Sequence, residues 1–268
     1  MRVEQLGEGE PEIAIVGGIH GDEPCGPRAV EALLRENPPV DRPVKLVVAN
    51  EEAISRNLRY VDEDLNRAFP GAPDADTHEG RLAHELLQEI RGCTVFSLHS
   101  TQSYANAFAL CDTVDATART VVPYLSVDAL VETEGFSEGR LIERRDVVEV
   151  ECGLQGSEEA AENGLALCKE FLAAMGVLPG EPHREREIPI FRMGRAVPKH
   201  AGERYEVFAQ NFQRVAAGER FAAADGEPLH ADESFYPILM SAYGYEDVFG
   251  YAGELAGRLD ARSASAGD

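Results

Sequence analysis

Apolar residues along the first two thirds of the chain follow two alternating patterns. Short apolar runs typical of buried strands cover residues 13–16, 44–50, 93–99, 107–111, 127–131 and 147–151. Apolar residues at helical spacing predict helices over 24–37, 80–91 and 158–174. Because strands and helices alternate, we expect an α/β fold with a mainly parallel or mixed sheet and helices on both faces.

The pattern changes after Gly176. Residues 185–197 and 205–221 predict short strands separated by Gly, Pro and Asp turns, and one short helix is expected over 245–249. The last residues are small and polar, which is typical of a frayed terminus. We therefore predict an α/β domain over 1–178, a small β-rich C-terminal domain over 179–255 and a flexible tail over 256–268.

Composition indicates the cellular setting. No apolar run approaches the roughly 18 residues of a membrane-spanning helix, and the N-terminal segment lacks the apolar stretch of a signal peptide. The five cysteines are odd in number, scattered and without a CxxC motif, which favours reduced thiols. We therefore expect a cytoplasmic protein that does not bind membranes.

The strongly negative charge excludes a further class of partner. The formal net charge is −23, and lysine accounts for only three of the 25 basic residues. The acidic residues are spread along the chain, and such a surface repels nucleic acid and anionic lipid. It resembles the halophilic-type acidic surface of proteins from salt-accumulating cells, where salt screens the self-repulsion. The sequence does not determine the oligomeric state, and a homo-oligomer is one of the alternatives.

Polar residues follow several predicted strands at the point where each strand ends. His20 and Glu23 follow the first strand, His99 ends the third, and Glu151 ends the run at 147–151. Each has a purely structural alternative, such as a loop histidine beside a solvated acid or a buried hydrogen-bonded histidine. Because the carboxyl ends of parallel strands lie on one side of a sheet, we expect these residues to converge.

The converging residue types match a hydrolytic metal centre. Two histidines and one glutamate form a three-ligand zinc set that leaves a position for water. A further glutamate that is not a ligand can take the proton of that water. The loop over residues 59–67 adds Arg59, Asn66 and Arg67. Guanidinium groups in this loop can hold a carboxylate and stabilise an oxyanion.

The same residues lie in motifs that resemble a known family, the succinylglutamate desuccinylases and aspartoacylases. The resemblance covers residues 12 to about 155 in matching order and the C-terminal part more loosely. It implies a zinc metallocarboxypeptidase-like fold with one zinc ion per chain in the 1–178 domain. The motifs are Gly-Gly-Ile-His20-Gly-Asp-Glu23, Arg59-Tyr-Val-Asp-Glu-Asp-Leu-Asn66-Arg67, Ser-Leu-His99-Ser and Val-Glu151-Cys-Gly.

The resemblance implies a role for each residue of the zinc centre. His20, Glu23 and His99 would be the zinc ligands. Glu151 would be the general base that later protonates the leaving amine. Arg59 would polarise the scissile carbonyl and stabilise the oxyanion.

The resemblance also implies a set of substrate-binding residues. Asn66 and Arg67 would bind the α-carboxylate of the substrate, with Asp64 supporting their loop. Tyr243 would contact the substrate from the C-terminal domain. Tyr245 is an alternative register, and packing in the core is an alternative for both tyrosines.

Two features depart from the family pattern. The third ligand follows Ser97-Leu98, whereas aspartoacylases typically have Asp-Leu there, and Ser-x-His-Ser is similar to the carboxypeptidase version. The arginine that reads a substrate side-chain carboxylate has three candidates. These are Arg140, Arg144 and Arg145, all of which precede Glu151.

The function expected from this resemblance is zinc-dependent amidohydrolysis of a small N-acyl amino acid. A zinc-bound water activated by Glu151 would attack a non-peptide amide bond. One alternative is a metallocarboxypeptidase that acts on peptide C-termini, because the chemistry is the same and only the pocket differs. Another is a non-catalytic homologue that binds zinc or a ligand. The sequence leaves the acyl group, the amino acid and the pathway open.

Overall fold

The computed structural model describes residues 1–136, 138–179 and 186–260. The helices are α1 (Cys25–Glu36), α2 (Glu51–Arg56), α3 (Leu65–Ala68), α4 (His78–Glu89), α5 (Ala116–Val121) and α6 (Glu158–Ala174), with the 3-10 turns η1 (Val122–Tyr124) and η2 (Leu141–Glu143). The strands are β1 (Arg2–Leu6), β2 (Ile13–Gly17), β3 (Val44–Val48), β4 (Thr94–Thr101), β5 (Phe108–Cys111), β6 (Leu130–Glu132), β7 (Val147–Leu154), β8 (Ile188–Arg192), β9 (Ala196–Pro198), β10 (Tyr205–Val207), β11 (Arg220–Ala224), β12 (Glu227–His230), β13 (Tyr236–Ile238) and β14 (Val248–Leu259).

One large mixed sheet organises the chain. Its strand order is β1-β3-β2-β4-β7-β5-β6-β8-β14-β13, and β9 pairs with β14. The centre, β3-β2-β4-β7, is parallel, whereas β1 and β5 run antiparallel to their neighbours β3 and β7. The expected α/β fold with a mainly parallel or mixed sheet is confirmed. Strands β2, β4 and β7 therefore end on the same side of the sheet, which is the condition for a shared site.

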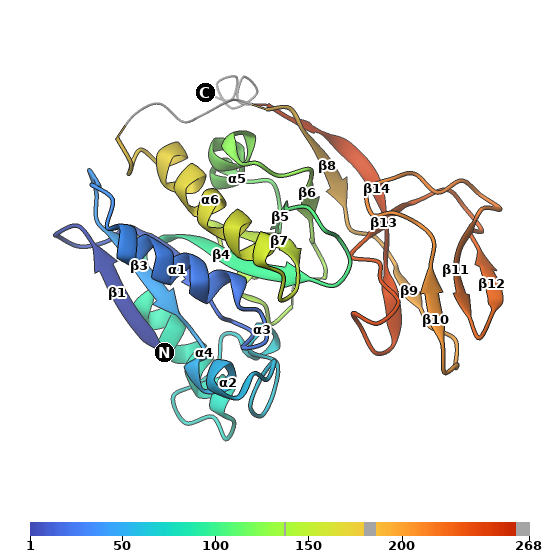
Figure 1. Cartoon of the computed structure of the whole chain (residues 1–268), viewed down its shortest axis with the longest axis horizontal. Helices are drawn as coiled ribbons and strands as arrows, with labels where there is room; N and C mark the ends of the chain where they lie inside the picture. The colour runs from blue at the N-terminus through green and yellow to red at the C-terminus, as the bar shows by residue number, and fades with distance from the viewer. Residues whose placement is uncertain (137, 180–185, 261–268) are drawn as a thin grey trace.

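Helices cover both faces of the parallel centre, so its strands are apolar throughout. Helices α1 and α6 lie in front of the sheet in Figure 1, and α4 lies behind it. On the front, Phe96 of β4 stacks on Phe171 of α6 with ring centroids 4.5 Å apart. On the back, Leu82 and Leu86 of α4 pack with Val16 of β2. Double-sided burial explains why these strands are continuous apolar runs in the sequence.

The turn between β2 and α1 is fixed by close approach of backbone segments. A Cβ atom on Gly17 would lie 2.5 Å from the carbonyl carbon of Gly26 in α1. One on Gly21 would lie 2.3 Å from the carbonyl carbon of Ala53 in α2. Only glycine fits at such distances. The two helices therefore clamp the residues between them, and these carry the first part of the site.

The C-terminal part continues the large sheet and then leaves it. Strand β8 pairs with β6 in parallel, and β14 pairs with β8 antiparallel. Strands β10, β11 and β12 form a separate three-stranded sheet. In Figure 1 these three strands form a lobe that projects from the main body. The division of the chain into two domains and a tail remains a prediction.

Two local expectations need correction, and two segments lie outside the described residues. The helix expected over 245–249 is absent, because Val248 begins β14 and pairs with β9. Strand β14 reaches Leu259, so residues 257–259 of the expected tail pair with β8. This long-range pairing overrides the weak local preference of Gly and Ala. Residue 185, where a strand was expected to begin, and residues 261–268 of the tail lie outside the described part.

None of the described helices is both long and apolar enough to cross a membrane. The longest of them, α6, has 17 residues, many of them charged or small. It packs on the sheet through Leu167, Phe171 and Leu172, which are buried.

Candidate active site

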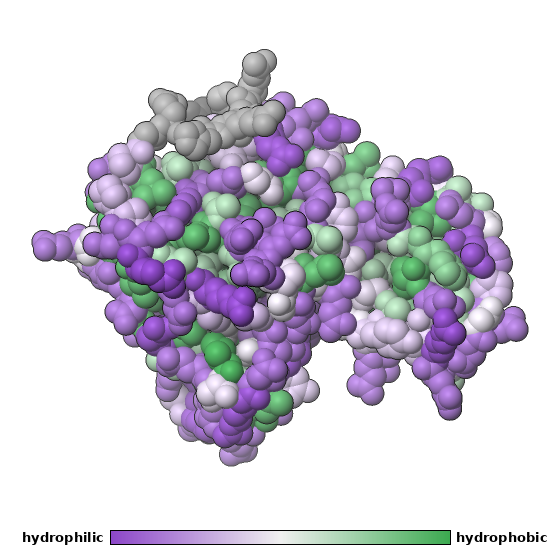
Figure 2. All heavy atoms as spheres, viewed as in Figure 1, coloured by the Kyte–Doolittle hydropathy of each residue, from purple (hydrophilic) through white to green (hydrophobic). Residues whose placement is uncertain are grey.

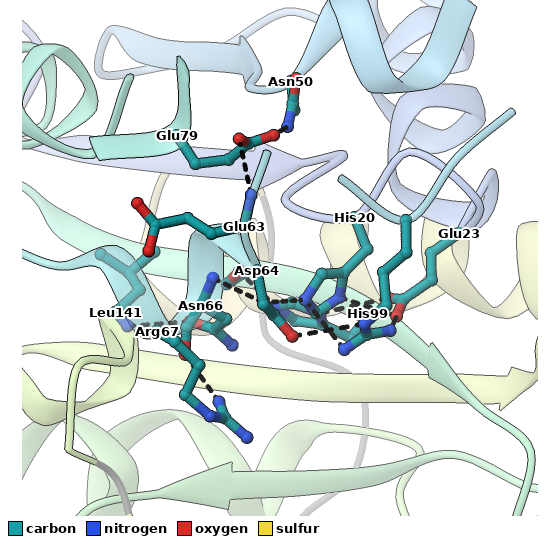
Figure 3. Close-up of polar contacts among 12 residues, drawn as sticks. His20, Glu23, Asn50, Glu63, Asp64, Asn66, Arg67, Glu79, His99 and Leu141 are labelled. Carbon is teal, nitrogen blue, oxygen red and sulfur yellow. Dashed lines mark hydrogen bonds and ion pairs between the residues drawn. The ribbon is translucent and has the colours of Figure 1, made fainter. Parts of the chain in front are cut away.

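Three side chains of metal-ligand type meet at the carboxyl ends of β2 and β4. His20 and Glu23 stand in the turn between β2 and α1, and His99 stands on β4. Oε1 of Glu23 lies 2.8 Å from Nδ1 of His20, and its Oε2 lies 3.2 Å from Nδ1 of His99. The three potential ligand atoms lie within 4.8 Å of one another, and no residue of the three is more than 4% exposed. Figure 3 shows them pointing toward one another.

The second ring nitrogen of each histidine is also engaged. Nε2 of His20 lies 3.0 Å from Oδ1 of Asp64. Nε2 of His99 lies 3.2 Å from Oγ of Ser97 and 3.9 Å from Oε1 of Glu149. A histidine held at one nitrogen presents the other in a fixed orientation, as metal-binding histidines generally do. Both Nδ1 atoms therefore face the carboxylate of Glu23.

The parallel pairing of β4 with β7 brings two further carboxylates to this place. Ser97 lies opposite Glu149, and His99 lies opposite Glu151. Since side chains alternate along a strand, all four lie on the same face of the sheet. Oε1 of Glu149 and Oε2 of Glu151 are buried and have no hydrogen-bond partner among the described residues. Two buried, unsatisfied carboxylate oxygens indicate a place built for a positively charged group.

The pKa values of the site report the same excess of negative charge. Burial alone would lower the pKa of His99, but the carboxylates of Glu149, Glu23 and Glu151 outweigh it and raise the pKa to about 10. Burial raises the pKa of Glu151 to about 7, and the carboxylates of Glu23 and Glu149 contribute. A cation at this place would offset the repulsion, and two nitrogens with one carboxylate match the ligands that zinc takes. The residues thus fit a zinc ion.

Arg59 lies beside the three ligand-type residues, as the loop motif led us to expect. Its Nη1 donates to Oε1 of Glu23 at 3.1 Å, and its Nε donates to Oδ2 of Asp64 at 3.3 Å. Its side chain is 43% exposed, so the guanidinium group also faces the pocket opening. Asp64 additionally accepts from the backbone N–H of Asn66 at the start of α3. One carboxylate therefore positions both His20 and the loop that carries Arg59.

A fully buried glutamate on α4 holds this loop in place. Glu79 accepts hydrogen bonds from the backbone N–H groups of Val61, Asp62 and Glu63 at 2.7–3.2 Å, and from Nδ2 of Asn50 at 2.9 Å. Figure 3 places Asn50 and Glu79 above the loop that leads to Asp64. Burial opposes the charged form, but these donors lower the pKa of Glu79. The polar loop is thereby rigid, although it contains little regular structure.

Basic residues gather at the other end of the pocket. Arg67 and Arg140 both line it, and the pKa of Arg67 is lowered by burial and then by the like charge of Arg140. Asn66 ties the two segments together, because its Oδ1 accepts from the N–H of Leu141 at 3.0 Å. Two neighbouring guanidinium groups favour a bound anion. Arg144 and Arg145, the other two candidates for this role, line different cavities.

The pocket is small and is bounded in part by C-terminal residues. Its volume is about 90 Å³, and its walls include every predicted site residue except Tyr243. Leu239, Ser241 and Tyr245 complete the walls from the segment between β13 and β14. One pocket therefore draws on both the α/β part and the C-terminal part of the chain. Figure 2 shows that hydrophilic residues cover most of the face of the molecule seen there.

The structure chooses between the two tyrosine registers. Tyr243 is 61% exposed, and its hydroxyl accepts from the backbone N–H of Tyr205 outside the pocket. Tyr245 lines the pocket instead, and burial raises the pKa of its hydroxyl. The structure thus places Tyr245, and not the expected Tyr243, in the walls of the pocket, and a substrate contact by either tyrosine stays a prediction. The loop conformation decides which of two nearby tyrosines turns inward, and residue type alone does not.

Glu149 and Glu79 were not among the predicted site residues, although each left a signal in the sequence. Glu149 precedes Glu151 by two positions, which places both on one face of a strand. Glu79 stands in the first turn of α4, where an acid is usual for the helix dipole. Because an acid at this position needs no other explanation, the sequence did not reveal that Glu79 accepts from three consecutive N–H groups.

A family model decides the relationship. The model of the succinylglutamate desuccinylase/aspartoacylase catalytic domain matches residues 10–129. This part of the chain is therefore similar to the catalytic domain of that family. The matched segment contains His20, Glu23 and His99, and Glu151 lies beyond it. The resemblance drawn from the motifs is confirmed.

Relatives in the family are similar over limited stretches. An N-acyl-aromatic-L-amino acid amidohydrolase (carboxylate-forming) of Xenopus tropicalis is 29% identical over 106 residues, which are 34% of this chain and 34% of that protein. The aspartoacylase of Mus musculus is 36% identical over 83 residues, which are 30% of this chain and 25% of that protein. The chain thus spans only about a third or less of the length of these relatives.

Solved structures match nearly the whole chain. The product-bound ectoine utilization protein EutE (DoeB) from Ruegeria pomeroyi has a TM-score of 0.77 at 19% identity, covering 96% of this chain and 88% of its own. Murine aminoacylase 3 has a TM-score of 0.72 at 21% identity, covering 95% and 98%. At such identity the likeness establishes the shared fold, including the β-rich C-terminal part.

The contact between Glu149 and His99 yields a testable prediction. In Glu149→Ala we expect zinc affinity to fall about 10- to 100-fold, because His99 loses the carboxylate that orients it. Competition with a chromophoric chelator measures this without any assay of turnover. We expect a second substitution, Ser97→Asp on β4, to restore much of the affinity, because it returns a carboxylate to Nε2 of His99. Zinc affinity unchanged in Glu149→Ala would contradict this role.

Proposed function

We propose that the protein is a zinc-dependent amidohydrolase that cleaves the amide bond of a small N-acyl amino acid. The observation that carries the proposal is the convergence, in one pocket, of three ligand-type residues, a separate unsatisfied glutamate and a pair of guanidinium groups. The similarity of residues 10–129 to the catalytic domain of desuccinylases and aspartoacylases supports the reaction class.

His20, Glu23 and His99 would hold the zinc ion, with Asp64 and the pair Ser97 and Glu149 fixing the two histidines. When bound, zinc supplies a Lewis acid that lowers the pKa of a water molecule toward about 7 and polarises a carbonyl oxygen. Three protein ligands leave a coordination position for that chemistry. The ligands are buried in a pocket of about 90 Å³, which limits the access of bulk water.

Glu151 is the proton carrier of the proposed reaction. It stands opposite His99 on the neighbouring strand, and its Oε2 is unoccupied by other donors among the described residues. Its raised pKa lies close to neutral pH, where a carboxylate can accept a proton and give it back. Glu151 takes a proton from the attacking water and delivers it to the leaving nitrogen, so that a carboxylate and a free amino acid result.

The arginines have different proposed roles, which follow from their positions in the pocket. Arg59 lies next to Glu23, where its Nη atoms can donate to an oxyanion that develops on the scissile carbonyl. Asn66 and Arg67 bind the α-carboxylate of the substrate. Arg140 is the one of the three candidate arginines that reaches this pocket, so it reads a second carboxylate on the substrate. Tyr245 closes the pocket over the bound molecule.

The size of the pocket favours an N-acyl amino acid over a peptide. Its volume is about 90 Å³, and Leu239, Ser241 and Tyr245 stand in its walls, where they narrow the path for a chain that continues beyond the scissile bond. The metallocarboxypeptidase alternative requires such a path. The acidic, lysine-poor composition further suggests that the enzyme works in concentrated salt.

Glu151→Gln is the variant that tests the proposed mechanism. Glutamine keeps the shape of glutamate but cannot accept the proton, so we expect kcat to fall by at least about 100-fold. The zinc content, measured by mass spectrometry, is expected to stay at one ion per chain because Glu151 is not a ligand. Glu143→Gln, on the exposed side of η2, is the matched control and should keep both properties. Wild-type turnover in Glu151→Gln would remove this residue from the proposed role.

The pH dependence of kcat/KM provides an independent test. Glu151 acts as a base only when deprotonated, so activity is lost as the pH falls through its pKa. Burial and neighbouring carboxylates raise that pKa from 4.5 to about 7, and the charge of a bound metal ion acts in the opposite direction. We therefore expect the acid limb of the profile between these two values. A profile that stays flat below the ordinary glutamate range would argue against Glu151 as the base.

A further inference from the structure

A second cavity lies at the opposite end of the central strands from the pocket described above. It has a volume of about 600 Å³ and lies where the end of α4 meets the beginnings of β4 and β7. The pairs Val95–Val147 and His99–Glu151 are four residues apart along these strands, which is about 13 Å. The cavity is thus separate from the catalytic pocket, although both lie along the same two strands.

The floor of this cavity is apolar. Phe69, Leu87, Ile90 and Val95 line it, and each is at least 91% buried as a residue, with exposures of 8%, 9%, 4% and 2%. Cavities of about 300–1,000 Å³ with mainly apolar walls and a few charged groups are typical of small-molecule sites. The volume and the floor therefore suit a ligand with a hydrocarbon or aromatic body.

The rim carries three arginines, and these include the two that the catalytic pocket does not use. Arg140, Arg144 and Arg145 line the cavity. No salt bridge to any of their guanidinium groups occurs within residues 1–136, 138–179 and 186–260, and Nε of Arg140 is buried without a hydrogen-bond partner. Some arginines elsewhere have acidic partners, as Arg42 does with Glu12 at 2.9 Å. Three guanidinium groups without an acidic partner at one cavity can instead hold an anion from outside.

The acidic residues beside these arginines are engaged with other donors. Glu143 accepts from the backbone N–H of Gly139, at 3.3 Å. Asp146 accepts from Oγ1 of Thr117, at 2.9 Å. Neither forms a salt bridge with a described arginine. These donors are neutral and leave both carboxylates charged, so three arginines against two acids give the rim a net positive charge next to the apolar floor.

We propose that this cavity binds an organic anion in which a carboxylate or phosphate group is joined to an apolar body. Arg144 and Arg145 hold the anionic group, because guanidinium forks match the geometry of both oxyanions. The apolar body covers the side chains of Leu87, Ile90 and Val95. Arg140 lies in the walls of both cavities and is shared between this site and the proposed catalytic pocket.

Isothermal titration of the full chain with 4-phenylbutyrate tests the proposal. We expect wild-type protein to bind one equivalent, more tightly than it binds inorganic phosphate or 4-phenylbutan-1-ol, which each carry only half of the recognised chemistry. In the double variant R144S/R145S the affinity is expected to fall at least about tenfold, because both guanidinium contacts are lost. Arg28→Ser, on α1 at the opposite face of the sheet, is the matched control and should bind as wild type.

A second double variant and a turnover assay keep the test decisive if R144S/R145S folds poorly. R144K/R145K keeps the charge but lacks the fork, so its affinity is expected between those of wild type and R144S/R145S. Turnover in R144S/R145S should stay near wild type, because neither arginine lines the catalytic pocket. No binding of 4-phenylbutyrate to wild type, or equal binding to wild type and R144S/R145S, would overturn the proposal. Equal binding to both proteins would mean that the ligand binds at another place, such as the catalytic pocket.

Discussion

The parallel register between β4 and β7 is the constraint on which the site depends. It sets His99 opposite Glu151 and Ser97 opposite Glu149, so that one ligand-type residue, one proposed base and one orienting pair lie on the same face of the sheet. A slip of one residue would turn the β7 side chains to the other face. The packing of Val148 and Val150 in the core beneath α1 and α6 opposes that slip, because a slip would bring Glu149 and Glu151 into their place.

The second organising feature is the concentration of negative charge inside this frame. Glu23, Glu149 and Glu151 converge on His99 in a buried place, which is unfavourable unless a cation offsets it. The surrounding structure is arranged to keep them there. Asp64 holds His20, and Glu79 holds the loop that carries Arg59 and Asp64. The site thus depends on two further hydrogen-bonded acids, Asp64 and Glu79, that lie outside the proposed ligand set.

Much of the fold and the centre of the site could be predicted because they depend on local patterns. Apolar runs give the buried strands, helical spacing gives α1, α4 and α6, and strand ends give His20, Glu23, His99 and Glu151. The features that escaped prediction depend on distant partners. The extension of the sheet through β8 and β14 requires pairing with β6, which no local pattern reveals. The inward turn of Tyr245 in place of Tyr243, and the reach of Arg140 but not of Arg144 or Arg145 into the catalytic pocket, likewise follow from loop paths.

The most direct test of the central claim is release of free amine from a panel of N-acetyl- and N-succinyl-amino acids, in molar salt with added zinc. Short peptides with free C-termini form the comparison set. The account predicts turnover of at least one acyl-amino acid with two carboxylates, consistent with Arg67 and Arg140 in one pocket, and little or no cleavage of peptides. Cleavage of peptides in preference to every acyl-amino acid would contradict it, as would zinc-loaded protein that turns over neither class.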